Sequence, residues 1–369
     1  MMAKISVLPT SNNAKTVLGA AHAARERDET SNGKIDDPSD RTGVNRKNDE
    51  LERNPGTRFD LDPVKDVRVN RSAIERRTAT LGTRRTVKKD HQAAWLIHAV
   101  KTIDLTTLSG DDTAGTVKRL CAKAMKPIGA KLLADLGLTE AFATEPLQTG
   151  AVCVYHRFVA TAVAALAGTG IPVAAVSTGF PAGLSPFPQK IEEIKASVKA
   201  GAKEIDIVIS REHVLTGNWR ALYDETKAFR EACGDAHMKA IIATGELGTM
   251  KNIMRASIVC MQAGADFIKT STGKEPTNAT LAGSLVMVRA IRQYHEQTGV
   301  KVGFKPAGGI RSAKQALDWL ILMKEELGDE WMQPNLFRLG ASALVNDIER
   351  QLEHFAYERY ASMQYQPLG

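Results

Sequence analysis

The sequence predicts an α/β fold, a (β/α)8 TIM barrel with an N-terminal helical segment and a disordered N-terminal tail. From about residue 101, short apolar and often β-branched runs alternate eight times with longer stretches of helical periodicity, as in a parallel sheet. Eight such units between residues 101 and 344 fit the ~250 residues that one barrel usually needs. Polar residues and glycine loops follow the apolar runs, and barrel active sites gather at the C-terminal ends of the strands.

The residues before the barrel form two segments of different composition. Residues 1–57 carry nine Lys or Arg, nine Asp or Glu and no aromatic residue, which is typical of a disordered tail. Residues 58–90 hold ten basic and five acidic residues, so they contribute +5 of the formal net charge of +7. The predicted segments are the disordered tail (1–57), the basic N-terminal helical segment (58–100), the barrel domain (101–360) and a C-terminal tail (361–369).

The basic segment raises the question of a nucleic-acid partner. Its densest part, Arg84-Arg-Thr-Val-Lys-Lys89, could contact phosphates. Phe59 alone interleaves with the basic residues, so a platform for stacking bases is missing. A solvated surface is the better interpretation, and no nucleic-acid partner is expected. No run of ~18 apolar residues occurs, so no membrane partner is expected either.

The N-terminus shares one feature with targeting signals. Lys4, Lys15 and Arg25 occur in the first 25 residues without an acidic residue, as in mitochondrial presequences. Acidic residues follow from Glu26 onward, and the apolar face is poor. We therefore expect a cytoplasmic protein.

Each element of the barrel has its own sequence signal. Ala93, Leu96, Ile97 and Val100 recur with a helical period, so residues 90–102 should form a helix that packs against the barrel. Short β-branched runs predict the strands. The eight runs are residues 101–108, 151–155, 172–176, 204–209, 238–242, 266–269, 301–305 and 336–339.

Alternation along the strands assigns side chains to the two faces of the barrel wall. In the fourth strand Ile205 and Ile207 should meet the helix layer, which turns Asp206 inward. The same reasoning turns Lys269 of the sixth strand and Lys305 of the seventh strand inward. All three groups should therefore meet at one mouth of the barrel. A structural ion pair is the alternative role for the aspartate.

Two lysines on adjacent strands suggest covalent carbonyl chemistry. Burying one ammonium group is costly, and a second one nearby adds repulsion. At about 4 Å and an effective dielectric of ~20 the repulsion is roughly 4 kcal/mol, so one amine should lose its proton near neutral pH. A neutral lysine amine forms Schiff bases. The alternative is that each lysine extends from its strand end into solvent.

Glycine loops predict that the substrate carries a phosphate. The seventh strand runs into Pro306-Ala-Gly-Gly-Ile-Arg311, and the eighth into Gly340-Ala-Ser342. Loops after strands seven and eight form the recurring phosphate site of this fold, because glycine lets backbone N–H groups approach the anion. Ordinary turn chemistry is the other interpretation of the glycine pair.

From about Phe59 to Tyr360 the chain resembles the 2-deoxyribose-5-phosphate aldolase family, class I Schiff-base aldolases, in its animal-type branch. The resemblance depends on several segments in a fixed order. They are Ile103-Asp-Leu-Thr-Thr-Leu-Ser-Gly-Asp-Asp-Thr113, Ala151-Val-Cys-Val-Tyr155, Thr178-Gly-Phe-Pro-Ala-Gly183, Glu204-Ile-Asp206, Phe267-Ile-Lys-Thr-Ser-Thr-Gly-Lys274, Gly303-Phe-Lys-Pro-Ala-Gly-Gly309 and Gly340-Ala-Ser342.

The resemblance implies roles for individual residues. Lys269 would form the Schiff base, Lys305 would lower the pKa of that amine, and Asp206 would move protons through water. The implied reaction is reversible cleavage of 2-deoxy-D-ribose 5-phosphate to D-glyceraldehyde 3-phosphate and acetaldehyde, in deoxyribose phosphate catabolism. The substrate-binding residues implied or expected are Asp104, Cys153, Gly273, Lys274, Gly308, Gly309, Arg311, Gly340 and Ser342.

The chain also departs from the family pattern. Many bacterial members have serine where Ala343 stands and glutamate where Ala243 stands, and His156 occupies a position where the family has proline. Tyr365 could match a C-terminal tyrosine that reaches the site in some members. These differences bear on substrate affinity more than on the reaction.

No cofactor and no metal are expected, since the cysteines and histidines lack the spacing of a zinc site. The expected partner is a small sugar phosphate, and the sequence leaves open whether the protein forms a homo-oligomer. Two other functions also remain open. One is a different Schiff-base barrel enzyme, such as a transaldolase or a longer-chain sugar-phosphate aldolase. The other is a nucleic-acid-binding protein on a barrel without catalysis, against which the intact lysine pair and aspartate argue.

Overall fold

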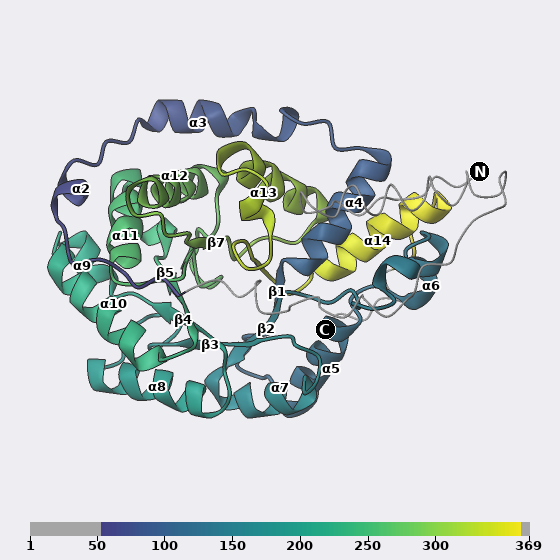
Figure 1. Ribbon diagram of the computed structural model, residues 1–369, viewed down its shortest axis with the longest axis horizontal. Coiled ribbons are helices and arrows are strands. Elements are labelled where there is room, and N and C mark those ends of the chain that lie inside the picture. The colour runs from purple at the N-terminus through teal and green to yellow at the C-terminus, as the bar shows by residue number, and fades with distance from the viewer. Residues whose placement is uncertain (1–52, 363–369) are drawn as a thin grey trace, which may run out of the picture.

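The computed structural model describes residues 53–362 and contains one eight-stranded parallel barrel surrounded by helices (Figure 1). Most of the expected tail 1–57 and residues 363–369 of the expected C-terminal tail, including Tyr365, lie outside the described residues. The strands are β1 (Ile103–Thr106), β2 (Ala151–Tyr155), β3 (Val173–Ser177), β4 (Glu204–Val208), β5 (His237–Ile241), β6 (Phe267–Lys269), β7 (Gly303–Lys305) and β8 (Leu339–Ala341). The predicted TIM barrel is confirmed.

Hydrogen bonding runs continuously round the barrel. Neighbours follow the order β7-β6-β5-β4-β3-β2-β1-β8, and every pairing is parallel. Parallel bridges from Phe304 to Phe337 and from Ala307 to Gly340 join β7 to the region of β8 and close the ring. A closed ring leaves no strand edge exposed to another chain.

Seven strands lie where the apolar runs predict them, but the eighth is displaced toward the C-terminus. The prediction was 336–339, and β8 is Leu339–Ala341. The N–H groups of Leu336 and Phe337 both bond back to the carbonyl of Gln333, so the backbone is still turning there. Residues 336–338 form only an isolated bridge to Phe304 of β7, and pairing with β1 begins where Leu339 meets Ile103.

The helices follow the strands in the order that a barrel requires. Side-chain caps mark several of their starts, for example Thr280 before α12 and Ser312, which forms a capping box with Gln315, before α13. The α-helices of the barrel domain are α5 (Ala114–Met125), α6 (Ala130–Asp135), α7 (Val159–Ala165), α8 (Phe187–Lys199), α9 (Arg211–Leu215), α10 (Trp219–Cys233), α11 (Met250–Gln262), α12 (Leu281–Thr298), α13 (Ala313–Glu326) and α14 (Leu344–Tyr357).

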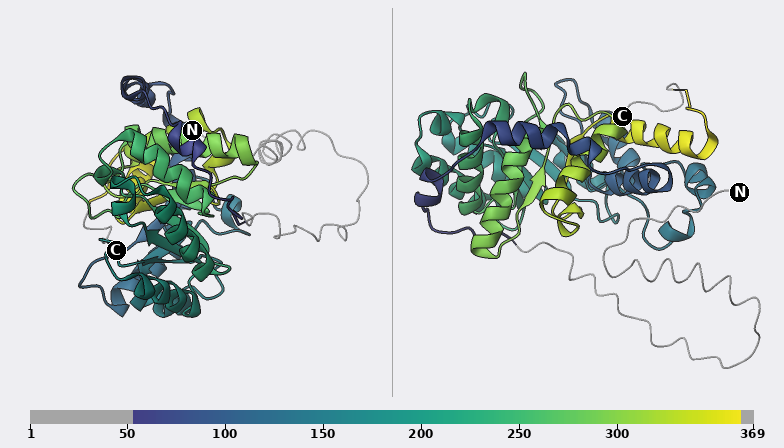
Figure 2. Two further views of the ribbon diagram at one scale, coloured as in Figure 1. Left: turned by 90° about the vertical axis from the view of Figure 1, so that its left-hand side faces the viewer. Right: turned by 90° about the horizontal axis from the view of Figure 1, so that it is seen from above.

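The segment before the barrel wraps the outside of the helix layer. Its elements are α2 (Asp62–Lys65), α3 (Arg71–Ala79), the 3-10 helix η2 (Leu81–Thr83) and α4 (Lys89–Lys101). In chain order α2 contacts α11, α3 contacts α12, η2 contacts α13, and α4 contacts both α13 and α14. Figures 1 and 2 show this strap crossing the outer surface of those helices. The predicted helix at 90–102 is confirmed as α4.

Ordered structure begins before residue 58. Asn54 is buried, and its side-chain amide donates to the carbonyls of Met261 and Ala265, while its backbone N–H donates to Asp266. The hydroxyl of Tyr294 donates to the Asn54 side chain. Residues 53–57, assigned to the tail on composition, thus belong to the folded unit.

Alternation sorts the strand residues as predicted. Ile205 and Ile207 belong to the large apolar cluster under the helices, as do Val302 and Phe304. The intervening side chains point into the barrel. A Cβ atom added at Gly303 would collide with the ring of Phe267, because both face the interior.

Candidate active site

The interior of the barrel holds a cluster of seven charged side chains, each buried. Every member comes from an inward position of a strand or from the residue that leads into one. The register places Lys269 beside Lys305 and Asp206 beside Lys239. The carboxylates are Asp104, Glu204 and Asp206, and the cations are Lys239, Lys269, Lys305 and Arg338.

Asp206 is the point at which the two predicted lysines meet. Its Oδ2 atom accepts a hydrogen bond from Lys269 Nζ at 2.7 Å and another from Lys305 Nζ at 2.8 Å. Its Oδ1 atom is buried and accepts no hydrogen bond from the described part of the chain, although Lys239 Nζ lies 3.5 Å away. One oxygen thus holds both lysines, and the other keeps its lone pairs.

The two lysines differ in the number of carboxylates that they contact. Lys305 Nζ lies 2.5 Å from Asp104 Oδ2 as well as 2.8 Å from Asp206. Among the ion pairs within residues 53–362, Lys269 has Asp206 alone. The amine with one carboxylate is the easier one to deprotonate.

The pKa values follow these contacts. Burial lowers the pKa of Lys269, and the charge of Lys305 lowers it further, while Asp206 opposes both effects. Burial disfavours the charge on Lys305 too, but the two carboxylates outweigh it and raise its pKa above the ordinary value. The pKa of Asp206 lies well below its ordinary value, because three lysines overcome its burial. Of the two lysines, Lys269 is therefore the one whose proton is held less tightly, whereas the carboxylates hold the proton of Lys305 more tightly. Repulsion from Lys305 acts as predicted, but burial contributes more.

The charge balance of the cluster also favours deprotonation of one lysine. With every group ionised, the three carboxylates and four cations leave one excess positive charge inside the barrel. Deprotonation of a single lysine makes the buried cluster neutral. Because buried charges are tolerated when they are paired, the protein environment favours loss of that proton.

Three members of the cluster were not predicted as site residues. Glu204 contacts Lys239, and Arg338 joins Glu204 to Asp104 through N–O distances of 3.0 and 2.6 Å. Each is a charged residue within or beside an apolar run, and Glu204 shares its face with Asp206. That signal was available in the sequence. What the sequence did not show was that these residues contact one another, which depends on the register that places β4, β5 and β8 round one interior.

Two predicted substrate-pocket residues line the same interior. Asp104 lies on β1 and binds Lys305 and Arg338. Cys153 lies on β2 with Ala174 and Val176 of β3, and burial raises the pKa of its thiol to about 11. At neutral pH this thiol is protonated, so its nucleophilicity is low.

The predicted phosphate loops adopt the backbone conformations that glycine permits. Gly273, Gly308 and Gly309 have φ angles of 87°, 84° and 81°. Gly273 lies against Gly308, since a Cβ atom added to it would lie 3.7 Å from the Gly308 Cα. The N–H groups of Gly308 and Gly309 make no hydrogen bond within the described chain, so they are available to an anion.

The polar side chains of the predicted phosphate set lie on the loops after β6, β7 and β8. Lys274, Arg311 and Ser342 are exposed. Gly340 has another reason to be glycine, because a Cβ atom there would lie 2.8 Å from the Ala307 side chain and 3.3 Å from Lys305 Cε. The structure brings the predicted set to loops on adjacent strands.

The departures from the family pattern have local structural settings. Ala243 follows β5 with a left-handed φ of 52°, a conformation that is costly for residues other than glycine. Ala343 precedes α14 and provides no side-chain cap, so its helix begins without the hydroxyl that serine would supply. His156 Nδ1 lies 3.9 Å from Glu193 on α8.

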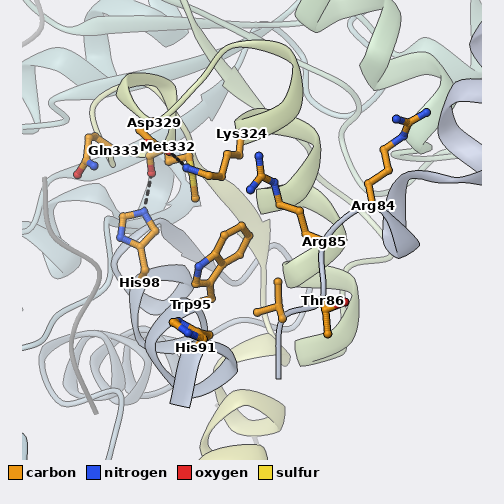
Figure 3. A pocket seen from close by; sticks show the side chains of 11 residues that line it. Arg84, Arg85, Thr86, His91, Trp95, His98, Lys324, Asp329, Met332 and Gln333 are labelled. Atoms are coloured by element: carbon orange, nitrogen blue, oxygen red, sulfur yellow. Dashed lines mark hydrogen bonds and ion pairs between the residues drawn. The ribbon is translucent and has the colours of Figure 1, made fainter. Parts of the chain in front are cut away.

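A cavity of about 460 Å³ lies away from this cluster, between α4, the loop before it and the connection from α13 to β8 (Figure 3). That connection leads into a strand, so the cavity lies at the end of the barrel opposite the catalytic mouth. Arg85 on its wall pairs with Glu325 at 2.7 Å, and Lys324 pairs with Asp329. Part of the basic segment thus neutralises acids of the barrel, which agrees with a structural role.

No helix among residues 53–362 is long and apolar enough to cross a membrane. The profile of the DeoC/LacD family aldolases matches residues 98–346. Deoxyribose-phosphate aldolase of Mus musculus is 56% identical over 316 residues, covering 85% of this chain and 98% of the mouse protein. The human enzyme of the same name is 56% identical over 318 residues, with 86% and 99% covered. The tetrameric deoxyribose phosphate aldolase of Aeropyrum pernix shares the fold, with a TM-score of 0.53, 21% identity and coverage of 77% of this chain and 99% of that one.

Proposed function

This chain belongs to the DeoC/LacD family of aldolases, and on that premise we propose that it is a deoxyribose-phosphate aldolase. It cleaves 2-deoxy-D-ribose 5-phosphate reversibly to D-glyceraldehyde 3-phosphate and acetaldehyde. The observation that carries the proposal is the shared Asp206 oxygen, which holds both Lys269 and Lys305 inside the barrel. The reaction serves the catabolism of deoxyribose phosphates.

Lys269 is the nucleophile in this proposal. Its neutral amine attacks the aldehyde carbon of the open-chain sugar, and loss of water gives an iminium ion. The iminium accepts the electron pair of the C2–C3 bond when that bond breaks. Lys305 remains an ammonium because Asp104 and Asp206 hold its proton, and its charge keeps the Lys269 amine available.

Asp206 serves as the base for bond cleavage, acting through water. The proton of the C3 hydroxyl must leave as glyceraldehyde 3-phosphate forms, and the Oδ1 atom has lone pairs free to receive it. The iminium nitrogen of Lys269 keeps one N–H where the neutral amine had two, so Asp206 loses one possible donor when the iminium forms. The same group can return a proton to the enamine carbon, after which hydrolysis releases acetaldehyde and restores the lysine.

The phosphate binds across the loops that follow β6, β7 and β8. Gly308 and Gly309 offer backbone N–H groups, and Lys274 and Arg311 add positive charge at the exposed rim. Ser342 and the uncapped start of α14 lie on the third loop. This arrangement anchors the substrate at a distance from the reacting carbons, so that binding energy can be used in the transition state.

Product analysis tests the proposed activity. The purified protein should convert 2-deoxyribose 5-phosphate into glyceraldehyde 3-phosphate, detected with a coupled dehydrogenase, and into acetaldehyde in equal amount. In the reverse direction it should accept acetaldehyde as donor. Transfer of a three-carbon dihydroxyacetone unit, without any product from acetaldehyde, would instead identify a transaldolase.

The location and assembly of the protein are further proposals. Its sugar phosphate substrate and buried thiols suit the cytoplasm, which fractionation of the cells that make it would test. Self-association is proposed by analogy with the tetramer of the Aeropyrum pernix relative. Light scattering of the purified chain gives its mass directly, and a single-chain mass at micromolar concentration would refute the oligomer.

A further inference from the structure

A buried carboxylate in the loop from β6 to α12 has no part in the reaction described above. Glu275 is 7% exposed. The backbone N–H of Thr272 donates to both of its oxygens at 3.0 Å, and the Thr272 hydroxyl donates at 2.7 Å. The N–H of Gly273 donates at 3.1 Å. This internal anion therefore occupies the N–H groups that a phosphate would otherwise meet at Gly273.

These bonds determine the course of the chain at Lys274. The Thr272 hydroxyl that donates to Glu275 also accepts the N–H of Lys274 at 3.1 Å. Gly273 between them has a left-handed φ of 87°. Residues 272–274 are thus wound round the carboxylate, and Lys274 is left exposed at the rim.

The same loop is also tied to the glycine pair after β7. The carbonyl of Glu275 accepts from the Asn278 side chain at 2.8 Å. Asn278 packs on Gly308 so closely that a Cβ atom added there would lie 2.6 Å from the Asn278 Cβ. The N–H of Ala279 donates to Ala307 at 3.3 Å. Glu275 therefore lies between the segment that carries Lys274 and the segment that contacts Gly308.

We propose that Glu275 is a positioning residue for the substrate phosphate, which deepens the proposed function and depends on it. Its carboxylate orders residues 272–274 so that the Lys274 ammonium faces the anion held by the N–H groups of Gly308 and Gly309. Glu275 itself does not contact the substrate. Gly273 then contributes its backbone conformation and not its N–H, which Glu275 already holds. Four hydrogen bonds to a buried carboxylate are enough to fix a short loop.

Glu275→Gln tests the proposal with little change in shape. The amide replaces one acceptor by an NH2 group, which cannot accept from the N–H groups that it faces. KM and kcat are measured for 2-deoxyribose 5-phosphate and for free 2-deoxyribose. For the phosphorylated sugar KM should rise about tenfold or more, with kcat changed less than about threefold. For the free sugar kcat/KM should stay within about twofold of wild type.

Glu225→Gln is the matched control. Glu225 on α10 is 8% exposed and accepts the N–H and the hydroxyl of Ser210 at 3.0 and 2.6 Å, as Glu275 does from Thr272, and it also pairs with Lys190 at 3.0 Å. It lies on the β4 side of the barrel, away from the phosphate loops. The Glu225→Gln variant should prefer the phosphorylated sugar to the same degree as wild type, even if the variant is less stable.

Equal losses with both sugars in Glu275→Gln, or an unchanged KM, would overturn the proposal. If that variant does not fold, Thr272→Val removes the hydroxyl that links Glu275 to Lys274 and should raise the same KM. An unchanged KM in Thr272→Val would overturn it as well. Wild-type protein is assayed in parallel. If the wild-type protein does not cleave the phosphorylated sugar, the proposed function is refuted. If the wild type is active and Glu275→Gln has the same KM, this inference alone is refuted.

Discussion

At the residue scale, the number of carboxylates beside each lysine assigns the two roles. Lys305 contacts Asp104 and Asp206, whereas Lys269 contacts Asp206. The carboxylates raise the pKa of Lys305, whereas burial and the nearby charge of Lys305 lower the pKa of Lys269. In the proposed mechanism, the lysine that attacks the substrate is thus selected by its neighbours and not by its own chemistry.

Removal of the fixed charge should shift the pH dependence of the reaction. In wild type, kcat/KM rises as Lys269 loses its proton, and the lowered pKa of that lysine places the rise below 10.5, the ordinary lysine value. Lys305→Leu removes a repulsion, so the pKa of Lys269 rises and the rising limb moves to higher pH. Activity at pH 7 should fall by roughly one to three powers of ten and recover in part at raised pH.

The control for this shift is Lys301→Leu, which removes a lysine from the other end of the seventh predicted strand. Lys301 is paired with Glu330 at the surface, so its loss should leave the pH profile unchanged. Full activity of Lys305→Leu at pH 7 would mean that burial alone deprotonates Lys269.

The phosphate site makes a second prediction at this scale. Lys274→Ala should lower kcat/KM roughly ten- to a hundredfold with 2-deoxyribose 5-phosphate, because a charge-assisted hydrogen bond contributes about 1.5 to 3 kcal/mol. With free 2-deoxyribose the change should be small. Steady-state kinetics on both sugars decide the matter. Equal losses would show that Lys274 serves the fold or the chemistry.

At the scale of single elements, the sequence predicted what depends on local pattern. The positions of seven strands, the inward direction of Asp206 and the pairing of the two lysines followed from alternation, and the structure confirms them. The start of β8 was missed, because the backbone turn at Gln333 leaves no trace in an apolar run. Glu204, Lys239 and Arg338 were missed because their partners lie on other strands, and register is not visible in one sequence.

The tight interior of the barrel predicts the effect of one added methyl group. Gly303→Ala would drive a Cβ atom into the ring of Phe267. The free energy of unfolding should fall by about 1 to 3 kcal/mol, the usual cost of overpacking. Gly110→Ala is the control, because a Cβ atom there meets no atom within 4 Å. Chemical denaturation of both variants measures the difference. If the unfolding free energy of Gly303→Ala equals that of wild type, β6 and β7 separate easily.

At the scale of the whole molecule, the N-terminal strap links the start of the described chain to four consecutive helices. Asn54 makes the first of its contacts with the barrel domain, and Arg77 makes a later one by pairing with Glu325 and Glu326 on α13. None of these contacts involves the catalytic mouth. The strap should therefore support the stability of the barrel and leave the reaction unaffected.

Two truncations separate the strap from the tail. A chain that begins at residue 53 keeps Asn54, and one that begins at residue 58 loses it together with its bonds to Met261, Ala265 and Asp266. Both should keep kcat within a few-fold of wild type. The shorter chain should lose about 1 to 3 kcal/mol of unfolding free energy, since several buried hydrogen bonds disappear. A loss of turnover beyond about tenfold, roughly 1.4 kcal/mol of barrier, would show that residues before 58 reach the site or hold an oligomer together.

The central claim is that Lys269 alone forms the covalent adduct with the substrate carbonyl. Borohydride reduction in the presence of acetaldehyde, followed by peptide mass mapping, tests it most directly. Wild type should carry one ethyl group, on Lys269, and Lys269→Ala should carry none and lose aldol cleavage entirely. A label on Lys305 or Lys239 in wild type, or a single labelled lysine that persists in Lys269→Ala, would contradict the account.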